Sequence, residues 1–140
     1  MRSFDFKVRK VDRMSIATPE ELIRSYIAAY NRFDLDGMCA LLASNVRFEH
    51  HTDGQLGVRT DGLHEFRQLA ETGAAMFSER KQRITALRLD GNHAVAEIAF
   101  SGKFAKDIPG GPSAGTLVTL NGTSEFTFEE GCIGTIIDRS

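Results

Sequence analysis

The most constraining feature of the sequence is a well-marked helix start followed by an apolar stripe. In the run that begins Thr18-Pro-Glu-Glu, the side chains of Thr18 and Glu21 can each accept a hydrogen bond from the other's backbone N–H, which forms a capping box. Pro19 suits the first helical position, because the N–H that it lacks would have no partner there. Apolar residues then recur at helical spacing, namely Leu22, Ile23, Tyr26, Ile27 and Tyr30. We therefore predict a helix over residues 20–33 with one buried face.

Two members of this stripe, Tyr26 and Tyr30, bring a hydroxyl group into an otherwise apolar face. A buried phenol needs a hydrogen-bond partner, and a ligand in a cavity can be that partner. Simple packing in the core is the alternative. We interpret both tyrosines as the lining of a pocket.

Composition and charge narrow the class of protein. A chain of 140 residues with 41% hydrophobic residues is large enough for one domain with its own core. A net charge of −2 gives no sign of a nucleic-acid partner, and no apolar run is long enough to span a membrane. Cys39 and Cys132 have no metal-binding spacing and indicate free thiols in a cytoplasmic protein. We divide the chain into an N-terminal extension, residues 1–17, and a single domain, residues 18–140.

Beyond the first helix, the patterns predict two more helices and a mainly antiparallel sheet. Asp34 can cap a short second helix, and a third helix begins near Gly62. Between these two helices we expect one strand and then a polar loop that contains Gly54 and Gly57. The predicted strands cover residues 45–51, 83–89, 93–104, 117–128 and 132–138, and a Gly- and Pro-rich loop covers residues 107–115. This order favours an α+β fold, in which a curved mixed or antiparallel sheet wraps around the N-terminal helices as a cone with an internal pocket.

Polar residues on the inward faces of these strands are candidates for a site. His50 alternates with Phe48 on one face of its predicted strand. Ser124 shares a face of its own strand with Val118 and Phe126. If no bulge changes the register, both polar groups point towards apolar surroundings.

The order of elements and two motifs resemble the cone-shaped α+β superfamily of ketosteroid isomerase, the SnoaL-like polyketide cyclases and nuclear transport factor two. The first motif begins at Tyr26 and reads Tyr-Ile-Ala-Ala-Tyr-Asn-Arg-Phe-Asp-Leu-Asp-Gly-Met. The second begins at Phe126 and reads Phe-Thr-Phe-Glu-Glu-Gly-Cys-Ile. The resemblance covers residues 18–138 and implies the cone fold. It implies no single activity, because the superfamily includes enzymes, carriers and adaptors.

The isomerase branch also implies positions for a site. Its oxyanion-hole tyrosine falls at Tyr26, its general-base aspartate at His50, and its second oxyanion donor, a protonated aspartate, near Ser124. Two of the three positions therefore carry another residue, which argues against steroid isomerisation and leaves proton transfer open. An imidazole that an apolar pocket keeps neutral is a suitable base. We predict His50 and Tyr26 as catalytic residues and the following as pocket lining: Tyr30, Phe48, Ser124, Phe126 and Val118.

Other polar residues have ordinary explanations. His50 and His51 point to opposite faces of a strand and cannot easily share an ion, so we predict no metal site. Asp138 is a possible acid or base, but a carboxylate at a strand end is usually solvated. Arg59 and Arg67 suit a carboxylate-bearing ligand, although solvated surface positions explain them equally well.

Three classes of function remain open at this point. One is a cofactor-free isomerase or cyclase that performs acid–base chemistry on a hydrophobic small molecule. The second is a non-catalytic ligand carrier or dimeric adaptor domain of the same fold. The third is a purely structural dimer module. We expect no nucleic-acid or membrane partner, and a homodimer through the outer sheet face, where relatives commonly pair. That face carries Thr119, Thr123, Glu125 and Thr127.

Overall fold

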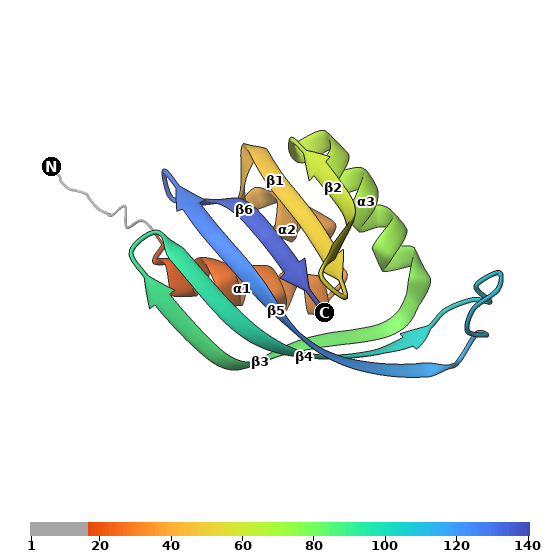
Figure 1. The fold of residues 1–140 in the computed structure, drawn as a ribbon. Helices are drawn as coiled ribbons and strands as arrows, with labels where there is room; N and C mark the ends of the chain where they lie inside the picture. Colours follow the sequence, from red (N-terminus) through yellow and green to blue (C-terminus); the bar gives the residue numbers. More distant parts are fainter. Residues whose placement is uncertain (1–16) are drawn as a thin grey trace, which may run out of the picture.

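The computed structural model describes residues 17–140 and shows helices packed on one curved sheet (Figure 1). The helices of this part of the chain are α1 (Pro19–Asn31), α2 (Leu35–Ala40) and α3 (Leu63–Met76). Its strands are β1 (Leu42–Thr52), β2 (Gln55–Asp61), β3 (Phe77–Asp90), β4 (His93–Phe104), β5 (Leu117–Glu129) and β6 (Cys132–Arg139). The strand order is β2-β1-β6-β5-β4-β3, and every neighbouring pair is antiparallel except the parallel pair of β1 with β6. The predicted α+β cone is confirmed.

The first two helices begin where their capping residues predict. The backbone N–H of Glu21 donates to Thr18 Oγ1 at 3.1 Å, and the N–H of Thr18 donates to Glu21 Oε1 at 2.8 Å. Asp34 Oδ1 accepts from the N–H of Gly37 at 2.9 Å and caps α2. These caps fix where the chain turns into each helix, and thereby which face of α1 meets the sheet.

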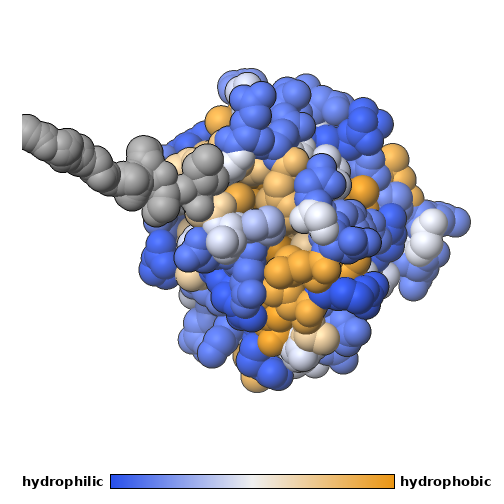
Figure 2. Space-filling view, turned by 90° about the vertical axis from the view of Figure 1, so that its left-hand side faces the viewer, coloured by the Kyte–Doolittle hydropathy of each residue, from blue (hydrophilic) through white to orange (hydrophobic). Residues whose placement is uncertain are grey.

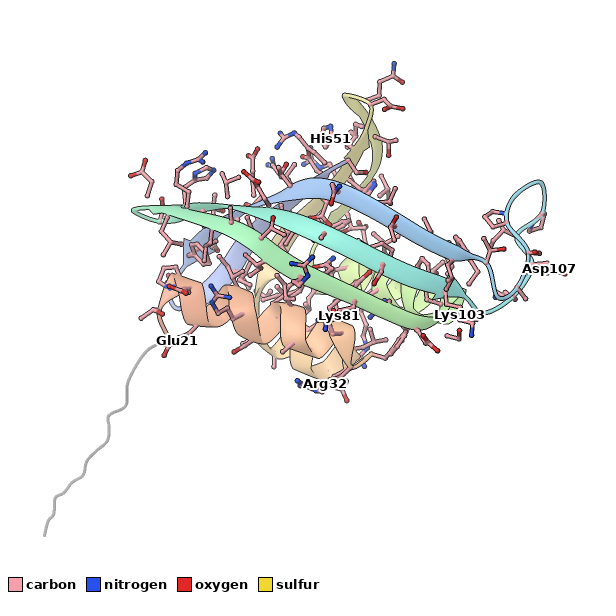
Figure 3. The ribbon with its side chains drawn as sticks, turned by 90° about the horizontal axis from the view of Figure 1, so that it is seen from below. Glu21, Arg32, His51, Lys81, Lys103 and Asp107 are labelled. Carbon is pink, nitrogen blue, oxygen red and sulfur yellow. The ribbon has the colours of Figure 1, made fainter. Side chains whose placement is uncertain are left out.

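The core lies between the buried face of α1 and the concave face of the sheet. Ile23 of α1 and Ile133 of β6 are both 0% exposed, and Phe126 of β5 is 1% exposed. Full burial of such a side chain stabilises the fold by about 1.5–3 kcal/mol. Seen from below, α1 lies along this concave face, while β3, β4 and β5 continue past the helices towards the loop near Asp107 (Figure 3).

The structure corrects the prediction between the second and third helices. The expected polar loop is an edge strand, β2, which pairs with β1. Asp53 and Gly54 form the turn with φ of 52° and 77°, the left-handed values that a tight two-residue hairpin turn requires. Leu56, Val58 and Thr60 alternate with other residue types, so a short strand signal is present, but Gly54 and Gly57 favour a loop.

The strand that follows α3 is longer than predicted. It begins at Phe77, directly after α3, rather than at Arg83. Its first half is polar, but the ring of Phe77 packs against Phe100 and Phe104, with centroid distances of 5.5 and 5.0 Å. These contacts with β4 extend the strand where the sequence pattern does not.

The end of the molecule with the β3–β4 and β5–β6 turns is mostly hydrophilic around a central apolar area (Figure 2). No helix within residues 17–140 has the length and apolar character needed to cross a lipid bilayer. The predicted N-terminal extension, residues 1–17, lies outside the described residues except for Ala17.

Candidate functional site

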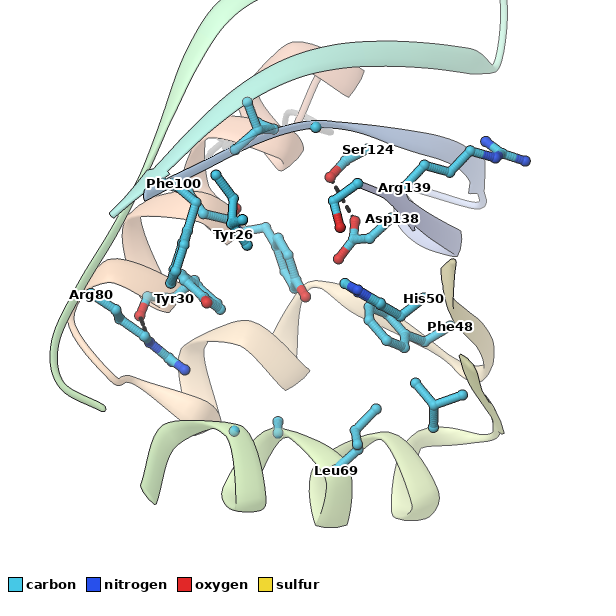
Figure 4. Close-up of a pocket in the computed structure, with 18 of the residues that line it drawn as sticks. Tyr26, Tyr30, Phe48, His50, Leu69, Arg80, Phe100, Ser124, Asp138 and Arg139 are labelled. Carbon is cyan, nitrogen blue, oxygen red and sulfur yellow. Dashed lines mark hydrogen bonds between the residues drawn. The ribbon is translucent and has the colours of Figure 1, made fainter. Parts of the chain in front are cut away.

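A cavity of about 480 Å³ lies between α1, α3 and the concave face of the sheet (Figure 4). This volume is within the range of small-molecule sites. Most of the lining is apolar and includes Met38, Phe48, Phe66, Leu69, Ile98 and Phe126. The cavity therefore suits a small molecule with a largely apolar body.

Three polar residues lie side by side on neighbouring strands at one end of this cavity. Asp138 of β6 is the register partner of Ser124 on β5 and of His50 on β1. The hydroxyl of Ser124 donates to Asp138 Oδ1 at 2.6 Å, and all three residues line the cavity. Because register partners carry their side chains on the same face of a sheet, the carboxylate lies between a hydroxyl and an imidazole.

Tyr26 reaches the same end of the cavity from α1. Its hydroxyl points towards the imidazole of His50 (Figure 4). Its ring is 6% exposed and meets Phe126 edge-on, with a centroid distance of 6.4 Å and an interplanar angle of 76°. Burial, together with the nearby Asp138 carboxylate, raises the pKa of Tyr26 well above its ordinary value. The phenol therefore stays protonated and can donate a hydrogen bond.

The surroundings of Asp138 raise the pKa of its carboxyl group, which suits the transfer of a proton. Burial raises the pKa of the Asp138 carboxyl, while the hydrogen bond from Ser124 and the charge of His50 lower it. A carboxyl with a raised pKa exchanges protons more readily near neutral pH than an ordinary aspartate does. Such perturbed groups are concentrated at functional sites.

Of the two possibilities that the sequence leaves open for Asp138, the structure favours the one in the cavity. Its side chain is partly buried and faces the cavity. The signal was present in the sequence, because Asp138 follows Ile136 by two residues and strand residues two apart share a face. Ile136 is 1% exposed, which puts that face in the core.

The structure gathers most of the predicted site residues around one cavity. Those that line it are Tyr26, Tyr30, Phe48, His50, Ser124 and Phe126. Val118 is not among the lining residues. It lies at the start of β5, where it pairs with Gly102 of β4.

A bulge does occur next to His50, but the extra residue is Gly57 of β2, and His50 still faces inwards. The β1–β2 register shifts between His50 and His51, where His50 pairs with Val58 and His51 with Leu56. His51 is not a lining residue, and its Nε2 lies 2.8 Å from Glu49 Oε1. The two adjacent histidines thus have separate environments, and no group of three or more metal-ligating side chains occurs within residues 17–140.

Arg80 of β3 lines the cavity at the end away from Asp138 and His50, and sequence patterns gave no sign of it (Figure 4). It is only 7% exposed, and its Nε donates to the backbone carbonyl of Tyr30 at 3.0 Å. The guanidinium carbon lies 3.7 Å from the centre of the Tyr30 ring. Burial lowers the pKa of Arg80. The site therefore has a cationic end and an acid–base end.

The two arginines that the sequence suggested for a carboxylate lie elsewhere. Arg59 is exposed and pairs with Asp61. Arg67 pairs with Asp36 and, at 3.7 Å, with Glu71. Neither lines the cavity, which agrees with the solvated alternative for both.

The sequence matches the SnoaL-like domain family over residues 23–134. The chain belongs to this family. This match confirms the resemblance to SnoaL-like proteins that the two sequence motifs suggest. A search of curated proteins found no match.

Solved structures agree with this assignment. A proposed polyketide cyclase from Xanthomonas campestris pv. campestris is 25% identical with a TM-score of 0.74, covering 85% of this chain and 87% of that one. Another from Pseudomonas putida is 26% identical with a TM-score of 0.68, covering 84% and 87%. A Catenulispora acidiphila protein of ketosteroid isomerase-like fold, in complex with trimethylamine, is 19% identical with a TM-score of 0.71, covering 87% and 85%, and supports the fold alone. The SnoaL-like domain therefore has the same fold as these proteins.

Proposed function

We propose that this SnoaL-like domain binds a small, mainly apolar carbonyl compound and catalyses a cofactor-free proton transfer on it. The proposal depends on one observation, the convergence of Asp138, His50 and Tyr26 at one end of an apolar cavity. A proton acceptor and a neutral hydrogen-bond donor that face the same space are what enolisation requires.

In the proposed reaction, Asp138 is the base. Its carboxylate takes a proton from the carbon next to the substrate carbonyl, and the electron pair of that C–H bond moves to the carbonyl oxygen. The Tyr26 hydroxyl donates a hydrogen bond to the resulting oxyanion. Ser124 orients the carboxylate through its 2.6 Å hydrogen bond.

The second half of the reaction decides its class. If the substrate is a β,γ-unsaturated carbonyl compound and Asp138 returns the proton to the γ carbon, the double bond moves into conjugation and the result is an isomerisation. If the enolate carbon attacks a second carbonyl group of the same molecule, the result is a cyclisation, and the proton ends on the new hydroxyl. Neither route changes the oxidation state of the substrate, so neither needs a redox cofactor. The two proposed polyketide cyclases among the similar structures favour a substrate with more than one carbonyl group.

Deuterium exchange tests the chemistry without knowledge of the substrate. The protein is incubated in D₂O with a panel of cyclic ketones and β-diketones, and NMR follows deuterium uptake at the carbon next to each carbonyl. We expect catalysed uptake with the wild type and a loss of about 100-fold or more with D138N, the scale of general-base catalysis. E97Q is the matched control, because Glu97 is an exposed carboxylate of β4 outside the cavity.

Exchange at the wild-type rate in D138N would refute the assignment of the base. Ligands that bind in the cavity of the wild type without any deuterium uptake would instead favour the carrier function.

A further inference from the structure

The charge of Arg80 is poorly compensated for so buried a group. Its side chain is more than nine-tenths buried, and no carboxylate within residues 17–140 lies in ion-pair distance of it. Its Nη2 is buried without a hydrogen-bond partner among residues 17–140. Buried charges are normally paired, and a buried donor without a partner is unfavourable.

The fold nevertheless holds this guanidinium in a defined orientation. One edge donates to the carbonyl of Tyr30 at the C-terminal end of α1, whose dipole favours a cation. The plane stacks on two rings, with the guanidinium carbon 3.7 Å from the centre of Tyr30 and 4.5 Å from that of Phe33. Rings and a carbonyl fix a guanidinium, but they supply no full negative charge.

The position of the Phe33 ring has a conformational cost. Phe33 has φ of 60°, a left-handed value that is rare for a bulky residue, just after the end of α1. The backbone there is held by hydrogen bonds from Phe33 N to Tyr30 O at 3.1 Å and from Asp34 N to Ala29 O at 2.9 Å, which end the helix. Glycine usually occupies this position. Here the residue is Phe33, and its aromatic ring covers Arg80.

We propose that Arg80 binds the carboxylate group of an otherwise apolar ligand. A planar guanidinium with free N–H donors matches a carboxylate in shape and charge, and the ligand would supply the missing anion. Asp138 lies at the other end of the cavity, and its negative charge would repel the carboxylate of the ligand. The ligand therefore binds with its carboxylate at Arg80 and the rest of the molecule towards Asp138. The inference rests on the proposed function, and it narrows the substrate to a carbonyl compound that also carries an acid group.

Matched pairs of carboxylates and alcohols test this subsite. Isothermal titration calorimetry at pH 7 compares octanoate, decanoate and dodecanoate with octanol, decanol and dodecanol. We expect the wild type to prefer each carboxylate. R80M should weaken carboxylate binding by about 10- to 100-fold, the effect of a lost charged hydrogen bond, and alcohol binding by less than about 3-fold. R88M is the matched control, because Arg88 is an exposed cation of the same strand.

Two variants keep the test decisive. R80K retains the charge but not the two-pronged geometry, so it should bind carboxylates with intermediate affinity, and it serves if R80M does not fold. Equal binding of carboxylates and alcohols by the wild type, an equal loss of both in R80M, or no binding of any member would overturn the proposal. D138N should retain the carboxylate preference, so a lost preference and a lost proton transfer are separate outcomes.

Discussion

The Ser124 hydroxyl donates a 2.6 Å hydrogen bond to Asp138 Oδ1 across the β5–β6 pair, and His50 flanks the same carboxylate from β1. These three residues lie on three neighbouring strands, so their relative positions are set by the register of the sheet rather than by a loop. A carboxylate held in this way keeps its direction when a ligand binds. This rigidity is what a proton acceptor needs.

The raised pKa of Asp138 predicts a particular dependence of stability on pH. The fold holds the proton on this carboxyl more tightly than the unfolded chain does, because burial disfavours the charge. This contribution to the free energy of unfolding is therefore complete at low pH and is lost as the pH rises from the unfolded to the folded pKa. We expect D138N to be more stable than the wild type at pH 7, by roughly 1 kcal/mol. The gap should close below about pH 4, near the ordinary pKa of aspartate.

Thermal unfolding between pH 3 and 8 measures this gap. D107N, at an exposed loop aspartate, is the control, and its difference from the wild type should follow no such trend. A D138N variant that is less stable than the wild type at pH 7 would contradict the prediction.

Removal of the Tyr26 hydroxyl should separate chemistry from packing. Y26F keeps the buried ring and its edge contact with Phe126, so the melting temperature should change little. The exchange rate should fall by about 100-fold or more, because the oxyanion loses its donor. Y26A should in addition lose about 3–5 kcal/mol of stability, the scale for a large aromatic residue removed from a core. Unchanged exchange in Y26F would exclude the oxyanion role.

The two adjacent histidines provide a matched comparison. H50Q should slow deuterium exchange, because His50 lines the cavity beside Asp138. H51Q should leave the rate within about 2-fold, since His51 contacts Glu49 outside the cavity and general acid–base effects need direct reach. Rates measured by NMR at one pH with both variants decide the point. An equal effect of the two substitutions would show that His50 has no specific role.

Gly122 should be intolerant of even one methyl group. A Cβ there would collide with the backbone carbonyl of Arg139, next to Asp138. We expect G122A to destabilise the fold by about 1–3 kcal/mol and to slow proton transfer as β6 shifts. G73A is the contrasting variant. A Cβ at Gly73 meets nothing within 4 Å, and alanine is favoured over glycine in a helix interior by about 1 kcal/mol. Denaturant unfolding of both variants checks the contrast.

The homodimer through the outer sheet face stays a prediction. Thr119 is exposed on this face and Thr123 is half-buried, so a partner has access to the strand. Light scattering at micromolar concentration should give twice the chain mass of 15.5 kDa. A T119R substitution should shift the mass towards that of one chain, and a monomeric wild type would contradict the prediction.

The parts of the fold that could be predicted are those with strong local signals. The capping box at Thr18 and Glu21 fixes the start of α1, and Gly91, with φ of 61°, lies in the two-residue turn between β3 and β4. Periodicity alone also directed His50 and Ser124 inwards, and the structure has both in the cavity lining.

The parts that could not be predicted depend on contacts between distant segments. The first half of β3 is polar, and only its pairing with β4 makes it a strand. Arg80 looks like a surface residue in such a run, yet Tyr30 and Phe33 of another element cover it. The parallel pairing of β1 with β6 likewise has no local signal, and it is this pairing that makes Asp138 a neighbour of His50.

That parallel pairing also has a consequence for how the protein matures. β6 is synthesised after β1 and β5 and must insert between them. Until β6 has inserted, β1 and β5 lack the strand that joins them, and Asp138 is absent from its place between Ser124 and His50. A nascent chain can therefore form its helices and its outer hairpins first, but Asp138 joins Ser124 and His50 only after β6 has paired with β1 and β5.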